Sequence, residues 1–188
     1  MMATEWYYNN IGKHLKYGFF IEIGVFNGKT QNTTLVLENS GWDGLLVEPM
    51  PENIQKIKKN NRRAKLIEGA VWSSDGMVEM IDVGIPGQTG IKQTHKSPEE
   101  AKRIIKVVSY KFSSLPIPKH IDYLQIDTEG SELEILKTID LNEYNINHIC
   151  IEDNNGHYYD DPTYHNFMSS IGYNLVYTKQ QDRVYQKV

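Results

Sequence analysis

Short runs of apolar residues recur along the chain, and each is bounded by Gly, Pro, Asn or Asp. Runs of this length between turn-forming residues are typical of β-strands. Several are almost continuously apolar instead of alternating, which is the pattern of parallel strands covered on both faces. The runs predicted to be strands are FFIEIG, GLLVEP, AKLIEGAVW, VEMIDV, KVVSYKF, DYLQID, HICIED, YNLVYT and RVYQKV.

Helical patterns lie between many of these runs, at residues 30–39, 52–60, 131–139 and 162–171. Alternation of strands and helices favours an α/β fold with an open, mostly parallel central sheet and helices on both faces. The last two runs are separated by KQQD, so we predict a C-terminal antiparallel hairpin. A chain of 188 residues suits a single domain, residues 1–188.

Residues 84–105 interrupt this alternation. The segment opens with three closely spaced glycines and becomes helix-like after Ser97 and Pro98. Insertions at the ends of strands commonly cover a ligand site. We therefore predict a loop leading to a short helix, which serves as a lid or a substrate wall.

Composition narrows the function classes. Lys and Arg number 20 against 24 Asp and Glu, a net charge of -4, so a basic nucleic-acid binder is excluded. The one basic run, KIKKNNRRAK, is predicted to lie on the solvated face and last turn of a helix. Cys150 falls in an apolar run and reads as a buried thiol in a reducing compartment. Without a signal-type or membrane-spanning apolar stretch, we expect a soluble, cytoplasmic protein with no membrane partner.

The segment GVFNGKT is close to the phosphate-binding loop of ATPases, but it is one residue shorter than G-x-x-x-x-G-K-[ST]. Losing one residue from that loop removes a backbone N–H donor and changes the turn. The dinucleotide pattern G-x-G-x-x-G is also absent, because Phe26 stands two residues after Gly24. Gly24 and Gly28 instead form E-x-G-x-x-x-G with Glu22, a turn that lets a ligand approach the backbone closely.

Glu48 ends the second predicted strand, about 20 residues after the glycine turn, where a carboxylate is well placed to accept hydrogen bonds from ribose hydroxyls. This spacing predicts an adenosine ligand. Glu22 is positioned to reach a cationic amino group across the turn. A ligand with an ammonium and a sulfonium, and without phosphate, suits that carboxylate, and the pattern resembles motif I of class I S-adenosylmethionine methyltransferases.

IDYLQIDTEGSELEILKTI resembles the D-x-E-G-x-E-x-x-x-L signature of the FkbM methyltransferase family, and EIGVFNG, LLVEPMPENI, GAVWSSDGMVEM and GYNLVY extend the resemblance over nearly the whole chain. The resemblance implies a Rossmann-like class I methyltransferase fold and methyl transfer from S-adenosylmethionine, usually to an oxygen of a sugar or natural product. Gln125 and Trp72 depart from the family, which commonly has Lys and a smaller residue there. The residues predicted to bind the cofactor are Glu22, Gly24, Phe26, Gly28, Glu48, Ala70, Val71 and Asp127.

Methyl transfer from a sulfonium is an in-line displacement, and a sugar hydroxyl needs a base or a metal to weaken its proton. Asp127 and Glu129 lie on one strand-to-helix turn, although Asp127 also reads as a helix N-cap. The next strand ends in IEDNNGH, which resembles the strand end of metal-dependent catechol-type O-methyltransferases. Mg²⁺ or Ca²⁺ is one possibility. The predicted ligands of that metal are Asp127, Asp153 and Asn154.

Without a metal, Glu129 or His157 would be the base, with His95 of the suspected lid as a third candidate; the predicted catalytic residues are Asp127, Glu129 and His157. The aromatic run HYYDDPTYH either stacks on a flat acceptor or is a surface loop. The leading hypothesis is an S-adenosylmethionine-dependent O-methyltransferase acting on a small hydroxylated molecule or glycan. A phosphate-loop ATPase and a non-catalytic adenosine-binding module are the alternatives.

Overall fold

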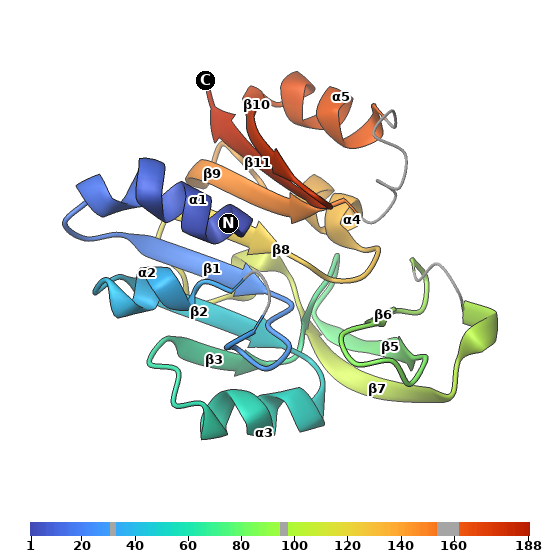
Figure 1. Cartoon of the computed structure of the whole chain (residues 1–188). Coiled ribbons are helices and arrows are strands. Elements are labelled where there is room, and N and C mark those ends of the chain that lie inside the picture. Colours follow the sequence, from blue (N-terminus) through green and yellow to red (C-terminus); the bar gives the residue numbers. More distant parts are fainter. Residues whose placement is uncertain (31–32, 95–97, 154–161) are drawn as a thin grey trace.

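The computed structural model describes residues 1–30, 33–94, 98–153 and 162–188, and two sheets form its frame (Figure 1). The main sheet has seven strands in the order β10-β11-β9-β8-β1-β2-β3. Its strands are β1 (Phe19–Ile23), β2 (Asp43–Glu48), β3 (Lys65–Glu68), β8 (His120–Ile126), β9 (Asn145–Glu152), β10 (Tyr173–Lys179) and β11 (Asp182–Lys187).

The neighbouring strands from β3 to β9 are all parallel, whereas β11 runs antiparallel to both β9 and β10. The parallel strands therefore end at the same edge of the sheet. β1 lies between β2 and β8, so the chain order reverses at β1. In open α/β sheets, ligands bind outside the carboxyl ends of the strands at such a reversal.

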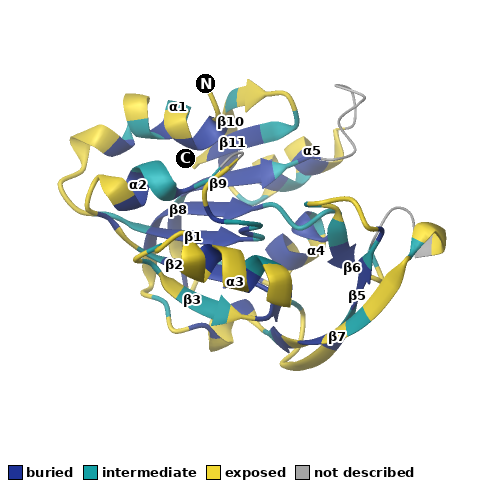
Figure 2. Ribbon diagram, turned by 60° about the horizontal axis from the view of Figure 1, so that its bottom comes forward, coloured by how far each residue is buried: buried dark blue, intermediate teal, exposed yellow. Residues whose placement is uncertain are grey.

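Helices cover both faces of the main sheet. Successive side chains of a strand point to opposite faces, and Phe20 and Ile21 of β1 accordingly belong to two different core clusters. One cluster includes side chains of α1 (Ala3–Asn10), α2 (Leu35–Asn39) and α3 (Pro51–Lys59). The other includes side chains of α4 (Glu132–Lys137) and α5 (Thr163–Ser170). In Figure 2 the central strands are buried, whereas α3 exposes its outer side. The prediction of a mixed α/β fold with helices around a central sheet is confirmed.

A second sheet of four strands, in the order β4-β7-β5-β6, follows β3 directly along the chain. Its strands are β4 (Ala70–Val71), β5 (Gly76–Asp82), β6 (Thr89–Ile91) and β7 (Arg103–Tyr110). β5 is antiparallel to both β6 and β7, while β4 is parallel to β7. The sequence predicted strands here but not a separate sheet. No α-helix of the described residues lies between these four strands along the chain. The strands therefore pair with each other instead of extending the main sheet.

Residues 84–105 were predicted to form a loop leading to a short helix. Their described part contains a short helix at that place, the 3₁₀ turn η2 (Pro98–Glu100), but it also contains β6 and the start of β7, which were not predicted there. The β-branched run after Arg103 explains why the strand begins this early. Two more 3₁₀ turns, η1 (Gly12–His14) and η3 (Phe112–Ser114), lie elsewhere in the chain.

The N-terminal helix α1 was not predicted, because its sequence has no clear apolar stripe. It packs on the sheet through Tyr7, whose ring stacks on that of Tyr123 with 4.4 Å between ring centroids. The hydroxyl of Thr4 is buried and lies 3.1 Å from that of Tyr123.

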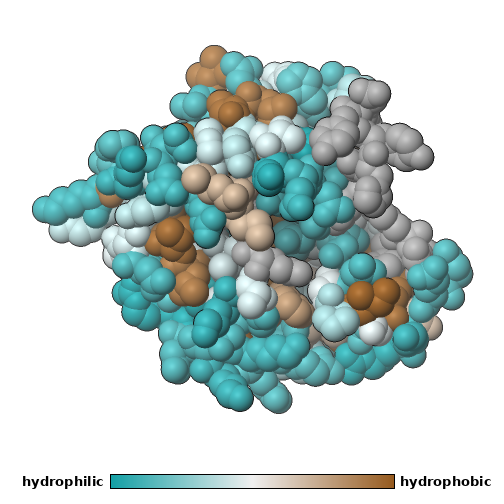
Figure 3. Space-filling model, viewed as in Figure 1, coloured by the Kyte–Doolittle hydropathy of each residue, from teal (hydrophilic) through white to brown (hydrophobic). Residues whose placement is uncertain are grey.

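The surface shown in Figure 3 is mainly hydrophilic, with separate small apolar patches. Such scattered patches are normal for a folded chain and do not by themselves mark an interface. Across the described residues, every helix is too short or too polar to traverse a lipid bilayer.

Candidate active site

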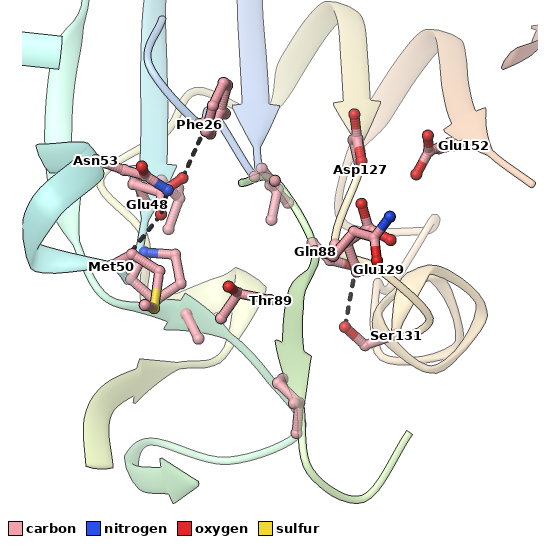
Figure 4. A pocket seen from close by; sticks show the side chains of 18 of the residues that line it. Phe26, Glu48, Met50, Asn53, Gln88, Thr89, Asp127, Glu129, Ser131 and Glu152 are labelled. Carbon is pink, nitrogen blue, oxygen red and sulfur yellow. Dashed lines mark hydrogen bonds between the residues drawn. The ribbon is translucent and has the colours of Figure 1, made fainter. Parts of the chain in front are cut away.

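A cavity of about 370 Å³ opens at the carboxyl ends of the parallel strands. Its wall combines the ends of β1, β2, β8 and β9 with residues of β4, the β5–β6 connection and the β10–β11 turn. Figure 4 shows two polar groups at opposite ends of this cavity, one around Glu48 and one around Asp127. A volume of a few hundred Å³ with a few convergent polar groups is typical of a small-molecule site.

Gly24 brings two strand ends together at the cavity wall. Its φ is 82°, and a Cβ at this position would lie 1.7 Å from the carbonyl oxygen of Asp127. The Asp127 N–H in turn donates to the carbonyl of Ile23 at 2.9 Å. Only glycine lets the ends of β1 and β8 approach this closely, so the predicted glycine turn has a direct structural reason.

Gly28 lies behind the turn and does not line the cavity. Its carbonyl accepts a hydrogen bond from Arg62 Nη1 at 2.9 Å. Asn27 Oδ1 accepts the backbone N–H groups of Lys29 and Thr30, each at 2.9 Å. These amides are used inside the loop, and the Lys29 side chain is exposed. The phosphate-loop interpretation of GVFNGKT is therefore not supported.

Glu22, predicted to reach a cofactor amino group, is turned away from the cavity. Alternation along β1 places its side chain on the sheet face that α2 covers. Glu22 Oε2 accepts hydrogen bonds from both the N–H and the hydroxyl of Thr34, and Arg62 Nη1 lies 3.5 Å away. Burial raises the pKa of Glu22, while Arg62 opposes that shift. Its contacts are structural, which corrects its predicted orientation.

Arg62 corrects the prediction of a fully solvated basic run. α3 ends at Lys59, and the side chain of Arg62 turns inward with 1% of its surface exposed. Its Nε lies 3.0 Å from Glu38 Oε2, and its Nη2 donates to Thr34 Oγ1 at 2.9 Å. We call Glu22, Glu38 and Arg62 the interior ion network. No local pattern in the chain marks this network, because the three residues meet only after folding.

Glu48 lines the cavity at the end of β2, as predicted (Figure 4). Its Oε2 accepts the N–H groups of Val25 and Phe26 at 3.0 and 2.9 Å. Its Oε1 accepts the N–H of Met50 at 3.0 Å and the side-chain amide of Asn53 at 3.2 Å. Burial raises the pKa of Glu48, and these four donors act in the opposite direction. The carboxylate thus ties the glycine turn to the second strand. Phe26, Ala70 and Val71 line the same cavity.

Asp127, Glu129 and Glu152 converge at the other end of the cavity, and we call them the edge acids. One carboxylate oxygen from each lies within 4.8 Å of the others. The side chains of Asp127 and Glu152 hydrogen-bond to each other. Burial raises the pKa of Asp127 well above its usual range, and the carboxylates of Glu152 and Glu129 raise it further. Asp127 therefore keeps its proton to a higher pH than an ordinary aspartate does.

Glu132 holds the turn that carries Glu129. Its buried carboxylate accepts the N–H of Thr128 at 2.7 Å and the N–H of Gly130 at 3.1 Å. Glu129 itself has a φ of 58°, which is uncommon for a residue with a side chain. Because Glu132 fixes both neighbours of Glu129, it helps to keep that residue in this conformation and directed toward the cavity.

The predicted metal ligands are not brought together in the described residues. Asp153 follows β9 and does not line the cavity, and its Oδ2 lies 3.6 Å from Arg183 Nη2. Side-chain alternation separates Asp153 from Glu152, which does line it. Asn154, His157 and His95 lie outside the described residues. The acidic group around Asp127 is completed by Glu129 and Glu152 instead.

The two departures from the family pattern lie away from the edge acids. Gln125 is buried on the α1 side of the sheet, where its Oε1 accepts the Thr4 hydroxyl at 2.8 Å. Trp72 packs against the core cluster of the second sheet. Neither residue lines the cavity.

Sequence reasoning assigned no role to several residues of the cavity. Glu152 and Asp153 are adjacent at the end of a strand. Because successive side chains of a strand point to opposite faces, strand alternation was the signal that only one of the two would line the cavity. Gln88, Gln180 and Asp182 also line the cavity, from the β5–β6 connection and the β10–β11 turn. No local pattern marks these three, because their distance from the edge acids depends on how the sheets are joined.

Comparison with known proteins identifies a family and a similar fold. The family model described as the methyltransferase FkbM domain matches residues 21–178. A crystal structure of the methyltransferase FkbM from Methylobacillus flagellatus KT is similar, with a TM-score of 0.58 and 14% sequence identity. That similarity covers 98% of this chain and 50% of the other, so this chain spans half the length of that protein. Among curated proteins there is no match.

Proposed function

We propose, from the premise that this chain belongs to the FkbM methyltransferase family, that it transfers the methyl group of S-adenosylmethionine to a hydroxyl oxygen of a sugar, glycan or small natural product. The observation that carries this proposal is the cavity at the reversal of strand order, with Glu48 at one end and the edge acids at the other. The strand order β3-β2-β1-β8-β9-β11-β10, with β11 antiparallel, supports a Rossmann-like class I methyltransferase arrangement.

The order of residues along the cavity supports this cofactor. Glu48 lies where the ribose hydroxyls would bind, and Ala70 and Val71 offer a buried apolar wall for the adenine. Gly24 lies between these residues and Asp127. Because it has no side chain, it would let the methionyl part of the cofactor approach the backbone there. This placement directs the reactive methyl group toward the edge acids. Bound there, S-adenosylmethionine supplies an activated methyl carbon.

The residues of the chain then have two tasks, positioning and proton removal. In this reaction the acceptor oxygen would form a bond to the methyl carbon while the carbon–sulfur bond breaks. The electron pair of the broken carbon–sulfur bond would stay on sulfur. Collinear alignment of these atoms contributes most of the acceleration. We propose that Glu129 takes the hydroxyl proton, since burial and the neighbouring carboxylates favour the protonated form of Asp127. Asp127 orients Glu152 and the acceptor. The predicted role of His157 as an alternative base falls outside the described residues.

A divalent cation remains a secondary proposal. Carboxylate oxygens are the ligand type that Mg²⁺ and Ca²⁺ take in proteins, so the edge acids fit such an ion in chemistry. An ion there would bind the acceptor hydroxyl and lower its pKa. The test described next therefore includes metal-free protein.

Titration calorimetry of metal-stripped protein with S-adenosylhomocysteine tests the cofactor site. We expect saturable binding that Glu48→Ala weakens at least about tenfold, because the variant loses the ribose acceptor and the support of the glycine turn. Glu68→Ala is the matched control, since Glu68 ends the neighbouring strand, pairs with Lys58 and does not line the cavity. Binding of ATP with Mg²⁺ in place of S-adenosylhomocysteine would overturn the proposal.

A further inference from the structure

The carboxylate of Glu48 accepts four hydrogen bonds from within the chain. Its Oε2 accepts the backbone N–H groups of Val25 and Phe26, at 3.0 and 2.9 Å. Its Oε1 accepts the backbone N–H of Met50 at 3.0 Å and the side-chain amide of Asn53 at 3.2 Å. An ionised carboxylate has about four lone-pair sites, two on each oxygen. The four donors therefore fill its capacity to accept hydrogen bonds.

This arrangement restricts how Glu48 can bind a ribose. Ribose hydroxyls bind a carboxylate at a strand end by donating hydrogen bonds to it. Glu48 is buried, with 3% of its surface exposed, and it meets a ligand only through the cavity that it lines. A ribose hydroxyl can therefore form a full hydrogen bond with Glu48 only in exchange for one of the four donors.

The three backbone donors are fixed in place by the structure around them. The glycine turn is closed by a hydrogen bond from the Gly28 N–H to the Val25 carbonyl at 2.9 Å. The Met50 carbonyl accepts the N–H of Ile54 at 2.9 Å at the start of α3. Releasing a backbone N–H from Glu48 would thus require a change in the turn or in the first turn of the helix.

The side-chain amide of Asn53 is the donor that can leave. Its contact with Glu48 is the longest of the four, and it depends only on side-chain torsions. Asn53 lies at the cavity wall beside Glu48 and is partly exposed (Figure 4). The rotated amide can therefore donate to water. Asn53 Oδ1 accepts a hydrogen bond from Lys56 Nζ at 3.2 Å, and the exposed Lys56 side chain can follow this movement.

We infer that Asn53 is a replaceable partner of Glu48, and that a ribose hydroxyl of S-adenosylmethionine takes the place of its amide on Glu48 Oε1. This inference rests on the proposed function, because it specifies how the ribose end of that site binds the cofactor. Asn53 is a positioning residue in this role, since it acts through Glu48. The exchange replaces one hydrogen bond by another, so the ribose contact adds less affinity than a carboxylate with an open acceptor site would give.

Titration calorimetry with S-adenosylhomocysteine, which carries the same ribose, tests the exchange by the sign of the effect. Asn53→Ala removes the competing amide and opens an acceptor site on Glu48. We expect the variant to bind S-adenosylhomocysteine at least about threefold more tightly than the parent protein, because binding no longer breaks a hydrogen bond. The titrations are run at pH 8, because the loss of a donor raises the pKa of Glu48.

Asn60→Ala is the matched control. Asn60 follows the last residue of α3, its amide donates to the Asn27 carbonyl at 2.9 Å, and it does not line the cavity. We expect this variant to bind S-adenosylhomocysteine with an affinity within about twofold of the parent protein.

Equal or weaker binding by Asn53→Ala would overturn the inference, because truncating a residue that only supports Glu48, or that contacts the ribose directly, does not increase affinity. That result would leave the proposed cofactor site intact. Failure of the parent protein to bind S-adenosylhomocysteine would instead overturn the proposed function, and the inference with it.

A second measurement uses the parent protein and needs no substitution. In a crystal structure of its complex with S-adenosylhomocysteine, we expect Asn53 Nδ2 to lie more than about 3.5 Å from Glu48 Oε1, with a ribose hydroxyl at hydrogen-bond distance from that oxygen. An Asn53 amide that still donates to Oε1 beside the bound ribose would overturn the inference, as would a ribose that does not contact Glu48.

Discussion

The interior ion network and the edge acids show two ways in which this fold uses carboxylates. Glu22 and Glu38 lie on the helix-covered face of the sheet, and Arg62 lies within 3.5 Å of a carboxylate oxygen of each. Asp127, Glu129 and Glu152 gather at the strand ends, where one carboxylate oxygen from each lies within 4.8 Å of the others. Around Arg62, opposite charges meet at short range and help to hold the loop and helices in position. At the strand ends, carboxylates lie against one another and raise the pKa of Asp127.

Removing the cation from the interior ion network should have the largest effect on stability. Arg62→Met leaves the carboxylates of Glu22 and Glu38 buried without their partner, and we expect a loss of about 3–5 kcal/mol in the free energy of unfolding. Urea denaturation measures it. The double variant Arg62→Met with Glu22→Gln should recover part of the loss. A change below about 1 kcal/mol would show that the network is not a significant source of stability.

Glu132 differs from both groups, because its buried carboxylate accepts hydrogen bonds from backbone N–H donors. Glu132→Gln weakens the support of Glu129, so we expect kcat to fall at least about tenfold with little change in affinity for S-adenosylhomocysteine. The Glu132 carboxylate also raises the pKa of Asp127, which acts in its protonated form, so the alkaline limb of the pH–rate profile should move to lower pH. Glu134→Gln, on the exposed side of α4, is the control. A variant with an unchanged profile and rate would remove Glu132 from the positioning of the site.

Replacing one edge acid by its neutral amide should have the smallest effect on stability. The effect should have the opposite sign, a gain in stability instead of a loss. Folding raises the pKa of Asp127 above its ordinary value near 4. The contribution of Asp127 to stability is therefore present below that pH and is lost as the pH rises through the pKa of the folded state. Asp127→Asn removes the cost of ionising this buried carboxyl at high pH. We expect the variant to gain about 1 kcal/mol of stability over the parent protein at pH 8 compared with pH 4, and to lose methyl transfer. Thermal unfolding at both pH values measures the difference. A variant equally destabilised at pH 4 and pH 8 would argue against the raised pKa.

Prediction succeeded where a local pattern and a physical rule coincide. The glycine turn and Glu48 were found because strand ends, glycine positions and a carboxylate at fixed spacing are all visible in the chain. It failed for Glu22, whose orientation depends on a single step of strand alternation. It failed again for Arg62, which looks like the other basic residues around it and is buried only because two acids from other segments meet it.

The metal ligands and the lid illustrate the same limit. Asp153 and Glu152 are neighbours in sequence, yet only Glu152 lines the cavity. Residues 84–105 were predicted to form a lid or a substrate wall. The β5–β6 connection lines the cavity, but the segment also supplies strands of a second sheet that was not predicted.

The sequence by itself determined the alternation of strands and helices, the family, and the residue types at the strand ends, because apolar periodicity and turn residues act over short stretches of chain. The tertiary structure alone decided which carboxylates meet at the cavity, which two are paired with Arg62, and which glutamines line the cavity. These relations depend on distances between segments far apart in sequence. Such distances are fixed only when the two sheets and the helices pack together.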